Sequence, residues 1–165
     1  MGDQMTHARI VERLEATPVW LRECFDALGA EAARVPADGE WSAAQILLHM
    51  RVSDAIVSPR VPHMLVRDDP PLIAFDDEAW GQLIAGVEVP VEDQLAAFSA
   101  MRRELVHVPR GLSDEQWART GQHELRGPVT IEAVARSIIE HEAEHRAQID
   151  GCVAPVRGAK ACGQR

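Results

Sequence analysis

Residues 130–152 read TIEAVARSIIEHEAEHRAQIDGC, and this stretch predicts a long amphipathic helix. The residues that share one broad face of that helix are Ile131, Val134, Ala135, Ile138, Glu142, His145, Ile149 and Cys152. Such a spacing is typical of a helix that buries one face against other helices. Thr130 is a suitable N-cap, and Gly151 and Pro155 predict where the helix ends.

Three other segments have the same helical periodicity and are bounded by capping or breaking residues. They are residues 6–34, the stretch from Ser42 to the prolines 59 and 62, and residues 91–108. Ser42 and Gln45 predict a capping box, because the Ser side chain and the Gln side chain can each bond the other's backbone amide. Pro18 lies inside the first segment, and we expect it to kink or split that helix.

The remaining stretches predict smaller elements. Residues 76–85 predict a short helix that carries Trp80, Ser113 and Gln116 predict a second capping box, and residues 119–129 predict a loop or a small hairpin. No long alternating strand pattern competes, so the fold class predicted is all-α, a four-helix bundle with a long crossover between helices 2 and 3. We expect residues 1–152 to form the bundle and residues 153–165 a flexible C-terminal tail.

Composition limits the partners of this 165-residue chain. Its formal net charge of −9 argues against a general nucleic-acid binder and against adhesion to an anionic membrane. No apolar run has the length of a membrane span. The three cysteines form no CxxC pair, and the chain shows no secretory leader pattern, so we expect reduced thiols and a cytoplasmic location.

Three histidines predict a metal site. His141 and His145 are four residues apart on the last helix, and His49 lies among apolar residues of the second helix. Taken separately, each feature has an explanation without a metal. The pair His141 and His145 could lie on the solvent-facing side of a helix, and His49 could be a buried imidazole that is hydrogen-bonded to a carbonyl or to Ser53. Together they favour one divalent ion held through ring nitrogens at about 2.0–2.2 Å. Three neutral ligands leave coordination positions open, as in catalytic sites.

The same stretch contains the peptidase motif HExxH, with Glu142 as the candidate base. The motif is short, and a peptidase of this kind also needs a strand edge to bind its substrate, whereas the sequence predicts no sheet. We therefore disfavour a peptidase. Glu142 is instead expected to orient a ligand or to relay a proton.

Several short motifs occur together in an order that is fairly specific. They are Trp41-Ser42 at the start of the second helix, His49 seven residues after Ser42, residues 127–130 before the last helix, and HxxxHxxQ ending at Gln148. On these motifs the chain resembles the DinB/YfiT-like superfamily over about residues 6–151. The resemblance implies a bundle unlike the simple up-and-down type, a metal on His49, His141 and His145, and frequent homodimers. It departs at Arg146, where relatives often carry a histidine or an aromatic residue.

Characterised members of that superfamily include S-transferases and isomerases that use bacillithiol, mycothiol or glutathione. The first hypothesis is therefore a metal-dependent thiol S-transferase or isomerase acting on a small-molecule substrate. The alternatives are a non-catalytic metal-binding stress-response protein and a metal-dependent hydrolase. The ion expected is zinc or nickel, with iron and cobalt as alternatives. The arginines expected to hold the carboxylates of a thiol cofactor are Arg51, Arg60 and Arg146.

Overall fold

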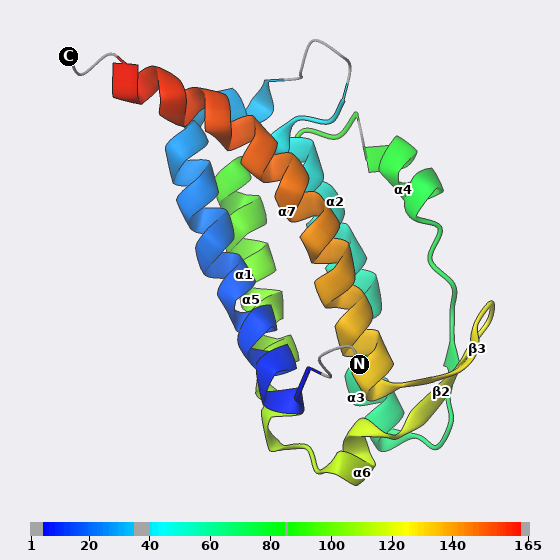
Figure 1. The fold of residues 1–165 in the computed structure, drawn as a ribbon. Helices are drawn as coiled ribbons and strands as arrows, with labels where there is room; N and C mark the ends of the chain where they lie inside the picture. Colours follow the sequence, from blue (N-terminus) through cyan, green and yellow to red (C-terminus); the bar gives the residue numbers. More distant parts are fainter. Residues whose placement is uncertain (1–4, 35–39, 85, 163–165) are drawn as a thin grey trace.

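The computed structural model describes residues 5–34, 40–84 and 86–162. Four long helices form a bundle, which confirms the predicted fold class (Figure 1). They are α1 (His7–Leu28), α2 (Ala43–Val57), α5 (Val91–His107) and α7 (Ile131–Cys162). None of the described helices is both long enough and apolar enough to cross a membrane.

The bundle does not follow the simple up-and-down order. Helix α1 packs against α5 and α7, and α2 packs against the same two helices, so α1 and α2 lie diagonally across the bundle. In Figure 1, α1 and α7 run in one direction, and α2 and α5 run in the other. Because α2 and α5 are parallel neighbours, the chain must return along the bundle between them. The return path is the predicted long crossover, which contains α3 (Arg60–Val66), β1 (Pro71–Leu72) and α4 (Asp77–Ile84).

The predicted helix starts are confirmed by their caps. The Ser42 hydroxyl accepts from the Gln45 amide at 3.3 Å while Gln45 accepts from the Ser42 amide at 2.9 Å. Ser113 and Gln116 form the same box at the start of α6 (Asp114–Trp117). Thr130 caps α7 by accepting from the Ala133 amide at 3.0 Å. These side chains satisfy amide groups that the first helical turn leaves without a helical partner.

Pro18 does not split the first helix, and α1 is continuous from His7 to Leu28 before a short 3-10 turn, η1 (Gly29–Ala33). A proline at position 18 cannot donate to the carbonyl of Leu14, four residues earlier. That carbonyl instead accepts from Nη1 of Arg102 at 3.2 Å. A side chain of α5 thus replaces the missing helical donor.

The predicted end of the last helix is wrong, because α7 continues past Gly151 and Pro155 to Cys162. The apolar stripe also continues, since Val153 is buried in the core and Val156 packs against it. This packing sustains the helix beyond the two breaking residues. Residues 163–165 lie outside the described part of the chain, and the flexibility of residues 153–165 stays a prediction.

A small three-stranded sheet was not predicted. Strand β2 (Thr120–His123) pairs antiparallel with β3 (Gly127–Thr130), which confirms the hairpin alternative, and β1 adds to β2 in parallel. With two residues, β1 is too short to leave an alternating pattern in the sequence. Gly121 permits its approach, because a Cβ there would fall 2.9 Å from the Leu72 side chain.

The core of the bundle consists of two apolar clusters separated by a polar layer. One cluster includes Ile10, Leu14, Leu105, Val134 and Ile138, and the other includes Leu21, Phe25, Met50, Phe98 and Ile149. Between them, each of the four long helices contributes a buried polar residue to one network of hydrogen bonds and ion pairs. These residues are Thr17, Asp54, Arg102 and Glu142.

Arg102 connects the polar layer. Its Nε donates to Asp54 Oδ2 at 3.2 Å, and its Nη1 forms an ion pair with Glu142. Glu142 also accepts from the Thr17 hydroxyl at 2.7 Å. Burial raises the pKa of both carboxyl groups, and the guanidinium opposes that rise. The layer therefore links all four helices through one buried cation.

Candidate metal centre

His49, His141 and His145 converge at the face that α2 and α7 share. Nε2 of His141 lies 2.9 Å from Nε2 of His49 and 3.0 Å from Nε2 of His145. One ligand atom from each of the three lies within 4.8 Å of the others. On α7 the convergence follows from the spacing of four residues, which places both imidazoles on one side of the helix. The predicted ligand set is thus brought together.

The donor set fits a divalent ion. A neutral imidazole nitrogen is either a donor or an acceptor, so three such nitrogens in mutual contact cannot all be satisfied by hydrogen bonds to one another. One ion accepts all three lone pairs. Two ligands at about 2.1 Å from an ion, with an angle of about 90–110° between them, lie about 3.0–3.4 Å apart. The separations of 2.9 and 3.0 Å are close to that range.

Neighbouring groups orient one of the rings and keep another uncharged. The Gln148 side-chain oxygen lies 2.7 Å from Nδ1 of His145, so Nδ1 donates to it and Nε2 is the nitrogen that faces the other two histidines. Burial, and then the charge of His145, lower the pKa of His141 to about 4. His141 is therefore neutral near pH 7, the form in which an imidazole can bind a metal ion.

The third ring is held by packing as well as by the helix. His49 is buried on α2, and the Trp41 ring lies 5.2 Å from it, centroid to centroid. Trp41 is covered in turn by Gly81 of α4, where a Cβ would fall 2.8 Å from the indole. The crossover thus fixes the wall of the site behind His49, and any larger residue at position 81 would displace that indole.

Replacing Gln148 with leucine should weaken metal binding about 10–100-fold, because the partner that orients the His145 ring is lost. Competition with a chromophoric chelator measures the change in dissociation constant. Leucine keeps the volume and the helix propensity, so helicity should be unchanged. Replacement of Ala147, which is exposed on the same helix and lines neither cavity beside the histidines, by leucine is the control. An affinity of Gln148→Leu equal to that of the control would contradict this role.

Other predicted site residues lie in different surroundings. The Glu142 carboxylate is engaged with Arg102 and Thr17 in the polar layer, and its catalytic role stays a prediction. The Arg146 guanidinium stacks over Trp20 of α1, 4.1 Å from the ring centroid. Arg51 is half-buried on α2. Neither Arg51 nor Arg146 is among the described residues that line the two cavities beside the three histidines.

Two cavities adjoin the histidines. One, of about 300 Å³, is lined by His141 together with Arg60, His123 and Arg126, and also by Asp54, Ser53, Phe75, Glu140 and Glu144. The charges of Arg60 and Arg126, after burial, lower the pKa of His123, so both cations act on the same ring. Of the three arginines predicted to hold a thiol cofactor, Arg60 therefore lines a cavity that also contains His141.

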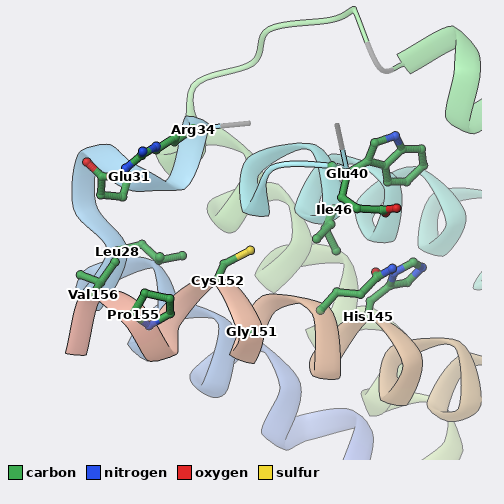
Figure 2. Close-up of a pocket in the computed structure, with 12 residues that line it drawn as sticks. Leu28, Glu31, Arg34, Glu40, Ile46, His145, Gly151, Cys152, Pro155 and Val156 are labelled. Carbon is green, nitrogen blue, oxygen red and sulfur yellow. Dashed lines mark hydrogen bonds and ion pairs between the residues drawn. The ribbon is translucent and has the colours of Figure 1, made fainter. Parts of the chain in front are cut away.

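The second cavity, of about 950 Å³, is lined by His145, Gln148 and residues farther along α7. Figure 2 shows His145 at one end of it. Trp41 forms part of its wall. His145 thus borders the large cavity, which is mainly apolar, and His141 borders the small one.

Two residues were not predicted to have the roles that the structure gives them, Gln148 beside the His145 ring and Arg102 in the polar layer. Gln148 belongs to the HxxxHxxQ motif, and its position three residues after His145 places it within reach of that ring. Arg102 follows Phe98 by four residues and precedes Leu105 by three, so a charged residue occupies a core position of α5. An arginine at such a position could have been used to predict a buried ion pair, because a buried charge needs a partner of opposite charge.

Comparisons with known proteins agree with the fold. The family model described as DinB superfamily matches residues 13–149. A protein of Oceanobacillus iheyensis named "Putative metal-dependent hydrolase" is 24% identical over 119 residues, which are 72% of this chain and 68% of that protein. YfiT of Bacillus subtilis, which carries the same description, is 23% identical over 141 residues, 84% of this chain and 79% of YfiT.

The solved structure of YfiT, described as a probable metal-dependent hydrolase with an unusual four-helix bundle topology, superposes with a TM-score of 0.80. The match has 20% sequence identity and covers 94% of this chain and 90% of that one. At this identity the likeness concerns the fold, including the order of helices described above. With the family match over most of its length, the chain belongs to the DinB superfamily.

Proposed function

We propose that this protein is a metal-dependent enzyme that activates the thiol of a small cofactor and transfers it to an electrophile. The observation that carries the proposal is the convergence of three ring nitrogens from His49, His141 and His145 beside two cavities. A divalent ion in such a site lowers the pKa of a thiol or a water molecule that binds to it, and so supplies a nucleophile near neutral pH. The ion proposed is zinc or nickel.

The chain's own residues would hold and orient the cofactor. Arg60 and Arg126 line the cavity that contains His141, and guanidinium groups bind carboxylates through paired hydrogen bonds. Low-molecular-weight thiols such as glutathione carry carboxylates. A chain with a net charge of −9 repels such a cofactor at long range, so local cations are needed to offset the repulsion.

Hydrolysis is the second candidate, and a different observation favours it. Glu140 and Glu144 also line the His141 cavity and offer carboxylates that can accept a proton from water. The names of the two curated relatives describe hydrolases. A peptidase of the HExxH type is not supported, because Glu142, the base that this motif requires, is committed to Arg102 and Thr17.

Activity assays with an added thiol, and assays with water as the only nucleophile, distinguish thiol transfer from hydrolysis. Metal-loaded protein should accelerate the attack of bacillithiol, mycothiol or glutathione on a panel that includes monochlorobimane and 1-chloro-2,4-dinitrobenzene, and His141→Ala should not. In a cobalt-substituted sample, adding the active thiol should produce sulfur-to-metal charge-transfer bands. His63→Ala is the matched control, because His63 is exposed on α3.

The outcomes are distinct. No turnover and no spectral change with any of the three thiols would contradict thiol transfer. Turnover of p-nitrophenyl esters without added thiol would favour hydrolysis instead. Charge reversal at Arg60 should raise the KM for the thiol more than it lowers kcat, if this residue holds the cofactor. The same change at Arg51 tests whether an arginine that does not line the cavity has any part in binding.

A further inference from the structure

The 950 Å³ cavity is not explained by metal binding alone. Figure 2 shows His145 at one end, Cys152 in the middle, and Leu28, Pro155 and Val156 toward the other end. Its volume is within the range of about 300–1,000 Å³ that small-molecule sites have. A binding site of this size beside a metal ligand can take a substrate considerably larger than its reacting group.

The walls of this cavity are mainly apolar. Leu28, Trp41, Ile46, Pro155 and Val156 supply carbon surface along its length. Three charged residues line the cavity, and two of them, Glu31 and Arg34, are paired with each other at 3.2 Å, so their charges offset each other. The third, Glu40, adds one carboxylate near the His145 end, which disfavours an anionic ligand. The other polar side chains that the described residues contribute near that end are His145 and Gln148.

Gly151 keeps the cavity wide. A Cβ added at this position would meet no atom within 4 Å, so the residue faces open space rather than a packed neighbour. Glycine inside a helix costs about 0.5–1 kcal/mol relative to alanine. A helix with a glycine at this place thus leaves room in the wall where a side chain would otherwise project.

We propose that this cavity binds an apolar group of the substrate, an alkyl chain or an aromatic ring, while the polar reacting group of the same molecule reaches the three histidines. The proposal rests on the proposed metal-dependent function and assigns it a substrate class. The carbon walls contribute affinity by removing the apolar group from water. The His145 end sets the position of the polar head.

Alkyl hydroxamates test the proposal, because the hydroxamate group chelates a divalent ion while the chain length varies. Calorimetry on zinc-loaded protein should give a dissociation constant for octanohydroxamate at least about tenfold below that for acetohydroxamate, since each buried methylene adds affinity. Gly151→Trp should fill the cavity and abolish this chain-length preference, while acetohydroxamate binding is retained.

Two further variants make the test specific. Ala154→Trp adds the same bulk at an exposed position of α7 and should have no effect on either ligand. Val156→Trp shortens the cavity from its far end and should weaken octanohydroxamate more than butyrohydroxamate. Circular dichroism and zinc stoichiometry check that each variant is folded and loaded.

Equal affinities of the wild type for octanohydroxamate and acetohydroxamate would overturn the proposal, as would an unchanged preference in Gly151→Trp. Absence of binding by any hydroxamate to zinc-loaded protein would also count against it. A different result would show that the proposed function, and not the apolar site, is wrong. A strong chain-length preference in a protein that turns over neither thiols nor esters would support the apolar site and contradict the enzymatic role.

Discussion

Replacing Arg102 with methionine should destabilise the bundle by about 3–5 kcal/mol, the cost typical of breaking a buried ion pair by removing one partner. The substitution leaves the carboxylates of Asp54 and Glu142 buried without their counter-charge. It also leaves the Leu14 carbonyl without the donor that replaces the Pro18 amide. In a domain of this size the midpoint of thermal unfolding should fall by about 6–20 °C.

Thermal or urea unfolding followed by circular dichroism measures the effect. Arg103→Met is the matched control, because Arg103 is the exposed neighbour on α5, and it should change stability by less than about 0.5 kcal/mol. Combining Arg102→Met with Asp54→Leu and Glu142→Leu should recover part of the loss, since no unpaired charge stays buried. An Arg102→Met variant as stable as Arg103→Met would contradict the role of the polar layer.

Replacing His49 with alanine should reduce metal affinity by more than the 10–100-fold typical of an outer-shell partner, because a ligand itself is lost. The bundle should stay folded, since the two apolar clusters that supply its core do not contain His49. Chelator competition measures the affinity, and far-UV circular dichroism measures the helicity. The exposed residue His63 again provides the control, as His63→Ala.

Two outcomes would contradict this account of His49. An affinity close to that of the wild type would remove His49 from the ligand set. Unfolding of the metal-free protein would make the metal a structural element, and the enzymatic proposal would lose its basis in an open coordination site.

The features that the sequence predicted well depend on local spacing. The helix caps at Ser42 and Ser113 need only residues three apart, and the pair His141 and His145 needs only one helical turn. His49 could be joined to that pair because it lies on an apolar helix face. A single sequence is enough to recognise these patterns, because the helical period places residues of fixed spacing on the same side of a helix.

The features that were wrong depend on contacts between distant segments. Helix α1 continues through Pro18, where Arg102 of another helix donates to the Leu14 carbonyl, so the helix is not split, and the predicted kink stays a prediction. Helix α7 continues past Pro155, and its residue Val153 is buried against the core. Strand β1 exists only as a partner of β2. Arg146 stacks on Trp20, a contact that the sequence did not predict, and its role at a cofactor stays a prediction. None of these pairings leaves a local pattern in the sequence.

X-ray absorption at the metal edge tests the central claim most directly. Protein loaded with one equivalent of zinc or nickel, without added thiol, should show three imidazole ligands at about 2.0–2.2 Å. His49→Ala, if it is loaded at all, should show two. Fewer than three imidazoles in the wild type, or a sulfur ligand from a cysteine, would contradict a centre built from His49, His141 and His145.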